Sequence, residues 1–204
     1  MRLVVEKLAA ERGDRVVFAD LSFVVEAGTL LRVSGANGVG KTTLLRIIAG
    51  LSAATEGNAA WYRADAIVAP TQAACFVGHV NAFNDALTVL ENLTYTAALA
   101  GLDAAPPQVG TALDAFGVKA LRSRRFGTLS QGQRKRCSLA RLLLDPKRGD
   151  RAWLLDEPFV ALDTATQAQL AAVISSELAA GGLVIYTSHQ AVEINAANAH
   201  EVAL

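Results

Sequence analysis

The sequence has few cysteines and no excess of charge, and both absences narrow what the protein can be. It holds two cysteines, Cys75 and Cys137, in 204 residues, which is too few for a disulfide framework. They form no C-x-x-C pair of the kind that binds zinc or carries out redox chemistry, so we expect free, buried thiols in a reducing cytosol. Lys and Arg together number 19, as do Asp and Glu. The chain therefore has no net positive charge that would attract it to nucleic acid or to an anionic membrane.

Long hydrophobic runs are missing as well. The N-terminal stretch MRLVVEKLAAERGDRVVF is interrupted by charges every few residues, so it lacks the apolar centre of a signal peptide. No segment approaches the roughly 20 apolar residues that span a bilayer. The composition, 52% hydrophobic and 19% charged, is typical of a globular chain. We expect a cytosolic protein whose membrane role, if it has one, comes through a partner.

Strand-like and helix-like patterns alternate after residue 29 and predict an α/β fold. Its mainly parallel sheet would be flanked by helices and preceded by N-terminal antiparallel strands. Strands are predicted at 2–8, 16–25, 29–34, 151–156 and 183–189, and helices at 42–50, 88–104, 108–116, from 130 onward and at 164–182. Pro106 and Pro107 are expected in a loop, and residues 52–75 in a weaker strand-and-turn region.

A mostly helical segment separates two of the strands that should share the sheet. It covers about residues 79–143. The sequence therefore predicts one domain over 1–204, with a core made of 1–78 and 144–204 and a helical sub-domain inserted at about 79–143.

The stretch GANGVGKT matches the phosphate-loop pattern G-x-x-x-x-G-K-[ST] at Gly35, Gly40, Lys41 and Thr42. Glycines let successive N–H groups face one concavity, and the following helix adds its positive N-terminal end. Lys41 supplies a charge for the β- and γ-phosphates, and the Thr42 hydroxyl is a magnesium ligand. A chance match would occur in about one chain of this length in a hundred. The expected nucleotide-binding residues are Gly35, Asn37, Gly38, Gly40, Lys41, Thr42 and Thr43.

Two further stretches carry chemistry. In WLLDEP, Asp156 ends an apolar strand and Glu157 lies just beyond it, where ligands sit in open parallel sheets. The alternative is a solvated acidic turn. In LSQGQ, Ser130 starts a helix and Gly132 leaves the backbone bare, which makes a second small anion site. Taken alone, LSQGQ reads better as a capped helix with a basic, solvated face.

Taken in order, these motifs resemble the nucleotide-binding subunit of ATP-binding-cassette (ABC) transporters along nearly the whole chain. The phosphate loop at 35–42 is followed by LSQGQ at 129–133, LLDEP at 154–158, ALD at 161–163 and TSH at 187–189. The resemblance implies a P-loop NTPase core, bound ATP and Mg²⁺, and a head-to-tail dimer with two ATPs at the interface.

The resemblance also implies residue roles. Each ATP would be held by Lys41 and Thr42 of one copy and by the signature residues of the other. Glu157 would be the general base or water-orienting group, and Asp156 would hold Mg²⁺ through water. His189 would contact the γ-phosphate, although it could instead only cap its strand. The signature residues are Ser130, Gly132 and Gln133, Asp163 couples the two sites, and Gln131 replaces the usual second residue of the signature.

Two positions depart from the general family pattern. His79 occupies the place of the Q-loop glutamine before LTVLENL, so it is a candidate sensor of Mg²⁺ or the γ-phosphate; the alternative is a surface turn. Arg12 stands where most relatives carry an aromatic that stacks on adenine, and Phe18 could serve instead. A histidine at residue 79 and the short chain resemble the ATP-binding subunit of the haem exporter of bacterial cytochrome c maturation.

The leading hypothesis is therefore an ATP-hydrolysing subunit on the cytoplasmic face of the inner membrane. It would power a membrane partner that binds beside residues 79–95 through a short coupling helix. The alternatives are the ATPase of another small-solute transporter and a soluble, ATP-switched protein that binds nucleic acid or ribosomes. A net charge of zero and the lack of a basic arm argue against nucleic acid.

Overall fold

The structure is a computed structural model that describes residues 1–13, 15–79, 82–102, 105–145, 149–189 and 192–204. The chain divides into two compact units. The first comprises Met1–Gly78, Arg148–Pro158 and Ile174–Leu204. The second comprises His79–Lys147 and Phe159–Val173. The helical segment expected at about 79–143 lies within the second unit.

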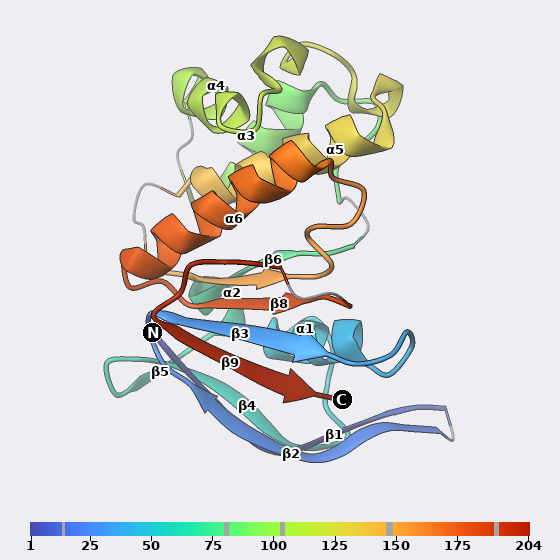
Figure 1. The fold of residues 1–204 in the computed structure, drawn as a ribbon, viewed down its shortest axis with the longest axis vertical. Coiled ribbons are helices and arrows are strands. Elements are labelled where there is room, and N and C mark those ends of the chain that lie inside the picture. Colours follow the sequence, from blue (N-terminus) through green and yellow to red (C-terminus); the bar gives the residue numbers. More distant parts are fainter. Residues whose placement is uncertain (14, 80–81, 103–104, 146–148, 190–191) are drawn as a thin grey trace. The chain divides into compact units, whose positions relative to one another are not determined.

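The first unit contains an antiparallel sheet in the order β2-β1-β4-β5 (Figure 1). The long strands β1 (Arg2–Arg12) and β2 (Arg15–Val25) pair with each other, and β4 (Glu56–Arg63) pairs with the other edge of β1. The short strand β5 (Ala66–Val68) completes the sheet. Leu3 lies opposite both Val25 and Trp61 in the register, so the alternating apolar residues of these strands form one buried face.

A second sheet of the same unit is parallel throughout and has the order β6-β7-β8-β3-β9. Its strands are β3 (Thr29–Ser34), β6 (Ala74–Val77), β7 (Ala152–Leu155), β8 (Val184–Thr187) and β9 (Asn198–Ala203). Every residue of β7 and β8 is buried, which explains why both sequences are apolar apart from Thr187 at the end of β8. The carboxyl ends of parallel strands meet at one edge of the sheet, and that edge is where the chemistry-bearing residues cluster.

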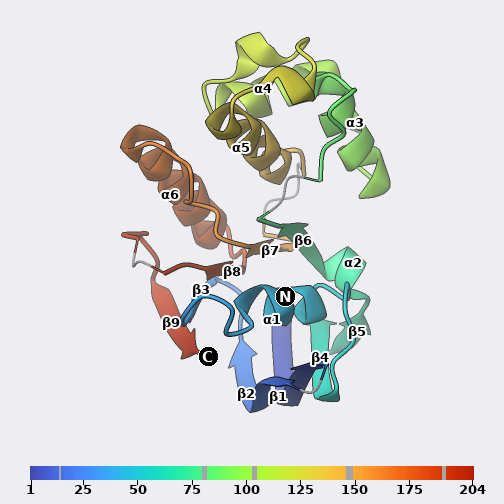
Figure 2. The same ribbon diagram turned by 90° about the vertical axis from the view of Figure 1, so that its right-hand side faces the viewer.

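Helix α1 (Lys41–Ile48) lies between the two sheets (Figure 2). Leu44, Leu45 and Ile48 are fully buried in the core that both sheets share. The indole Nε1 of Trp61 donates to the Ile48 carbonyl at 2.8 Å, so the largest core side chain also satisfies a carbonyl near the end of the helix. The short helix α2 (Pro70–Ala73) precedes β6.

The second unit is helical. It contains α3 (Val89–Leu99), α4 (Pro106–Asp114) and α5 (Gln131–Leu139), with 3₁₀ turns at Lys119–Leu121, Phe126–Thr128 and Ala140–Leu143. Helix α6 (Thr164–Ala179) has residues in both units. Helix α3 begins at a capping box, in which Thr88 and Glu91 each bond the other's backbone N–H. Thus the predicted fold class, an α/β P-loop core with N-terminal antiparallel strands, is confirmed.

The prediction of a loop at Pro106 and Pro107 was wrong, because both residues stand in the first turn of α4. Proline is accepted there since the N–H groups of the first turn need no partner within the helix. The sequence also gave no sign of β9, whose residues NAHEVA are mostly exposed. That strand forms through its backbone pairing with β3.

Candidate functional site

The phosphate loop follows β3 and ends at α1, and its glycines adopt conformations that other residues avoid. Gly40, the N-cap of α1, has φ of 118°, and a Cβ there would clash with the side chain of Val17. Gly35 has φ of 139°, and a Cβ there would lie 2.8 Å from the carbonyl oxygen of Leu204. The loop therefore requires glycine at both positions for conformation and for space.

The Lys41 side chain bonds the backbone of the phosphate loop that precedes it. This side chain is buried, and Nζ donates to the carbonyl oxygens of Gly35 at 2.8 Å and Ala36 at 2.9 Å. The same nitrogen lies 3.4 Å from Nε2 of His189. These carbonyls neutralise only part of a buried ammonium charge, so the position favours an anion as a further partner.

The two acids of WLLDEP follow β7 and have different environments. Asp156 is buried, and its Oδ2 accepts a hydrogen bond from the Thr42 hydroxyl at 2.8 Å. Glu157 is partly exposed, and its Oε1 lies 3.0 Å from Nε2 of His189. Nε2 of His189 is within reach of both Lys41 and Glu157. It accepts from the ammonium in the tautomer that leaves Nε2 without a hydrogen and donates to the carboxylate in the tautomer that places one there.

A pocket of about 230 Å³ lies beside the phosphate loop in the first unit. Its lining consists of Arg12, Val17, Asn37, Gly38, Gly40, Lys41, Thr42, Thr43 and Glu157. Six of them are predicted nucleotide-binding residues of the phosphate loop, and Arg12 is the predicted adenine contact. Gly35 contributes its carbonyl to Lys41 rather than a surface to the pocket. A triphosphate would meet the loop N–H groups, the N-terminus of α1 and the ammonium of Lys41 here.

The structure separates the two candidates for the adenine contact. Arg12 is exposed and lines the pocket, so its guanidinium plane is available to a base. Phe18 is only 7% exposed and packs in the core beside Gly40. The geometry favours Arg12.

The signature residues lie in the second unit, at the start of α5. The Ser130 hydroxyl accepts from the Gln133 N–H at 3.3 Å, and the Gln133 side chain accepts from the Ser130 N–H at 3.1 Å. Ser130 is therefore both an exposed helix cap and a group able to meet a ligand. Gly132 approaches Ala161, since a Cβ on it would lie 3.5 Å from the Ala161 carbonyl oxygen.

Asp163 caps helix α6. Its Oδ1 accepts from the Thr166 N–H at 2.7 Å, and this backbone bond holds the pKa of Asp163 below its usual value. The side chain is exposed, so the capping role is compatible with the coupling role that the family pattern implies.

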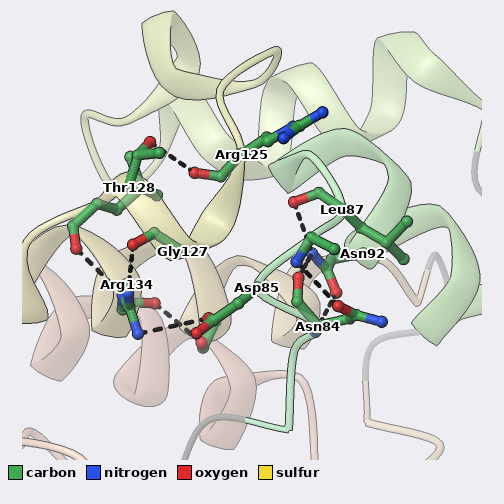
Figure 3. Close-up of polar contacts among 11 residues, drawn as sticks. Asn84, Asp85, Leu87, Asn92, Arg125, Gly127, Thr128 and Arg134 are labelled. Carbon is green, nitrogen blue, oxygen red and sulfur yellow. Dashed lines mark hydrogen bonds and ion pairs between the residues drawn. The ribbon is translucent and has the colours of Figure 1, made fainter.

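His79 is exposed and lines a pocket of about 520 Å³ in the second unit. Phe83 and Phe126 form one wall, with ring centroids 5.0 Å apart, and Arg134 stacks on Phe126 at 5.4 Å. Arg134 donates to the Gly127 carbonyl at 2.6 Å and forms an ion pair with the Asp85 carboxylate at 3.4 Å; Figure 3 shows both contacts. Arg134 thus ties the segment that follows His79 to the signature helix α5.

The sequence analysis assigned no role to two polar residues that organise these sites. Asn92, a buried residue of α3, bonds the backbone of Asn84, Leu87 and Thr88 (Figure 3). Thr187, fully buried at the end of β8, bonds both Asp156 and the backbone of Glu157. A polar residue within an otherwise apolar strand or helix face was the available signal in both cases.

The ABC transporter family model matches residues 18–160. The chain belongs to the ABC transporter family. It is similar, at 43% identity over 93% of this chain and 90% of the relative, to the cytochrome c biogenesis ATP-binding export protein CcmA of Albidiferax ferrireducens. The CcmA protein of Nitrosococcus oceani is 42% identical over 98% of this chain and 92% of the relative.

Solved structures agree with this family membership. An ABC transporter ATP-binding protein from Pyrococcus furiosus superposes with a TM-score of 0.82 at 25% identity, covering 98% of this chain and 97% of that one. A dimeric bacterial ABC transporter cassette has a TM-score of 0.79 at 20% identity, over 92% and 88% of the two chains, and shows the shared fold. The chain is therefore an ABC-type ATP-binding protein and an ATPase. Within the described residues, no helix is both long enough and apolar enough to cross a bilayer.

Proposed function

We propose that the chain is the ATP-hydrolysing subunit of the membrane complex that exports or hands over haem during cytochrome c biogenesis. The observation that carries the ATPase part is the cluster around Lys41, in which Thr42, Asp156, Glu157 and His189 are joined by contacts of 2.8 to 3.4 Å. The cytochrome c part is supported by the names of relatives that match nearly the whole chain, together with a histidine at residue 79.

The residues around Thr42 fit a magnesium ion. The Thr42 hydroxyl and the Asp156 carboxylate lie 2.8 Å apart, and hard oxygen ligands of this kind, with water completing the shell, are what Mg²⁺ prefers. Thr42 would bind the ion directly and Asp156 through water. When bound, the ion would supply positive charge beside the β- and γ-phosphates.

The hydrolytic step follows from the remaining groups. Lys41 neutralises charge on the β- and γ-phosphate oxygens, and His189 contacts the γ-phosphate from the end of β8. Glu157 accepts a hydrogen bond from the attacking water and serves as its general base or orienting group. The carboxylate has a neighbour that holds its direction, since its Oε1 lies 3.0 Å from Nε2 of His189.

A second copy of the chain completes each site in this proposal. Ser130, Gly132 and Gln133 of the partner subunit would bind the γ-phosphate through the hydroxyl and the N-terminal N–H groups of α5. Closing and opening of this dimer would move the membrane subunits, which bind near residues 79–95. The chain would thereby be held at the cytoplasmic face of the inner membrane. Nothing in its charge balance favours nucleic acid as a partner.

The cytochrome c assignment is tested in cells. Deletion of the gene should abolish covalent haem staining of c-type cytochromes while b-type cytochromes stay at their normal level. Complementation with the wild-type gene should restore staining, and Lys41→Ala should not. Unchanged c-type haem in the deletion strain would refute the haem assignment and leave an ABC ATPase of another transporter.

The hydrolytic assignment is tested with Glu157→Gln. Removing the carboxylate charge should trap ATP in a closed dimer, visible as a species of doubled mass in size-exclusion chromatography with ATP. A variant that hydrolyses ATP at the wild-type rate would show that Glu157 is not the base.

A further inference from the structure

Thr187 ends the buried strand β8, two residues before His189, and its side chain is completely enclosed. Its hydroxyl donates to Oδ1 of Asp156 at 2.8 Å and accepts from the backbone N–H of Glu157 at 2.8 Å. A hydroxyl has one hydrogen to donate. Because Asp156 takes that hydrogen, the lone pairs of Oγ1 remain for Glu157, and one atom joins both acids.

The backbone of Glu157 needs such a partner. Its φ is 48°, in the left-handed region that non-glycine residues adopt at a cost of about 1–3 kcal/mol. The bond from its N–H to Thr187 is part of what holds that conformation, and the conformation decides where the carboxylate points. Asp156 is fixed from two sides, by Thr42 on Oδ2 and by Thr187 on Oδ1.

We propose that Thr187 is a positioning residue for hydrolysis: its hydroxyl orients Asp156 and locks the backbone that aims Glu157. This inference deepens the proposed ATPase function and rests on it. Thr187 lies behind both acids rather than in the pocket, whose lining it does not join. Its effect should therefore fall on turnover rather than on nucleotide affinity.

The test compares side chains of similar size at residue 187. Thr187→Val removes the hydroxyl and nearly preserves the volume, and Thr187→Ser restores the hydroxyl. Loss of an outer-shell partner of a metal-binding carboxylate costs roughly 10–100-fold in activity. We expect kcat for ATP to fall at least about 10-fold in Thr187→Val, by that principle, with KM within about twofold. Thr187→Ser should keep most of the wild-type kcat.

Thr29→Val is the matched control. Thr29 is also a buried threonine of the parallel sheet, at the start of β3, away from the carboxyl ends of the strands. Its replacement should leave kcat unchanged. If Thr187→Val does not fold, Thr187→Cys provides the second variant, because a thiol is a weak donor and acceptor that fits the same space. Amide exchange of peptides containing Glu157 adds a readout independent of activity, and it should be faster in Thr187→Val.

The outcomes separate the two proposals. A wild-type chain that hydrolyses no ATP, alone or with its membrane partner, refutes the proposed function. A wild-type chain that is active beside an equally active Thr187→Val overturns the positioning role alone. The same conclusion follows if Thr187→Ser is as slow as Thr187→Val, since the hydroxyl would then not be the group that matters.

Discussion

Replacing Asn92 by alanine should destabilise the segment that follows His79. The Asn92 side chain accepts from the Asn84 N–H at 2.7 Å and donates to the carbonyls of Asn84 and Thr88, both at 3.0 Å. A fourth contact, to Leu87 at 3.4 Å, shares the same two hydrogens. Three bonds at about 0.5–1.5 kcal/mol each amount to roughly 3 kcal/mol. Alanine recovers about 0.5 kcal/mol through its higher helix propensity, so the net loss should be about 2.5 kcal/mol.

The backbone groups that lose the Asn92 side chain determine which part of the segment loses stability. The Thr88 carbonyl keeps a partner, because it also accepts from the Asn92 backbone N–H. The Asn84 carbonyl likewise still accepts from the Leu87 N–H at 3.2 Å. The Asn84 N–H loses its side-chain acceptor, so the turn at residues 84–88 should loosen first (Figure 3). That turn lies directly between His79 and the start of α3.

Urea denaturation followed by far-UV circular dichroism measures the loss of stability. Tryptophan fluorescence would not, because Trp61 and Trp153 both lie in the first unit and report on that unit alone. With a slope of about 2 kcal/mol per molar urea, the midpoint should fall by about 1 M. Amide exchange of peptides from 84–99 gives the local readout.

Asn84→Ala is the control for this prediction. It removes only the side-chain bond to the Ala86 N–H at 2.9 Å, on an exposed turn, and should cost at most about 1 kcal/mol. An Asn92→Ala protein that lost no more than the control, with unchanged exchange at 84–99, would refute the argument that Asn92 holds this segment.

Three further outcomes follow from the site and the core. His79→Gln should preserve ATP turnover in the complex whereas His79→Ala slows or uncouples it, and equal phosphate release by all three proteins would support the surface-turn reading. Burial raises the pKa of Cys137 to about 12, so at pH 8 a maleimide should label only the partly buried Cys75. Labelling that persists in Cys75→Ser would show that Cys137 is reactive. Gly40→Ala should abolish ATP binding measured by calorimetry, because φ of 118° and the contact with Val17 exclude a side chain; unchanged affinity would show that the loop adapts.

The predictable parts of this protein are those that local chemistry determines. The phosphate loop requires glycine and lysine at fixed spacing, and the buried strands β7 and β8 require mostly apolar residues, so both could be located before the structure was known. Contacts between segments that are distant in the sequence produce no comparable local sequence pattern. Nothing near Phe18 indicates that its ring packs beside Gly40, and the segment NAHEVA shows no alternation that would predict β9.

The acidic pair shows why the catalytic geometry needed the structure. A left-handed backbone conformation is usually found at glycine or asparagine. Here Glu157 adopts it, at a place where the sequence predicts only a strand that continues into a turn. Glycine at this position would relax the backbone but remove the carboxylate. The protein instead keeps the strained conformation and stabilises it through a threonine thirty residues away in sequence, on the neighbouring strand. Strain that is retained at a carboxylate, against a simpler local solution, is best explained by the direction in which that carboxylate must point.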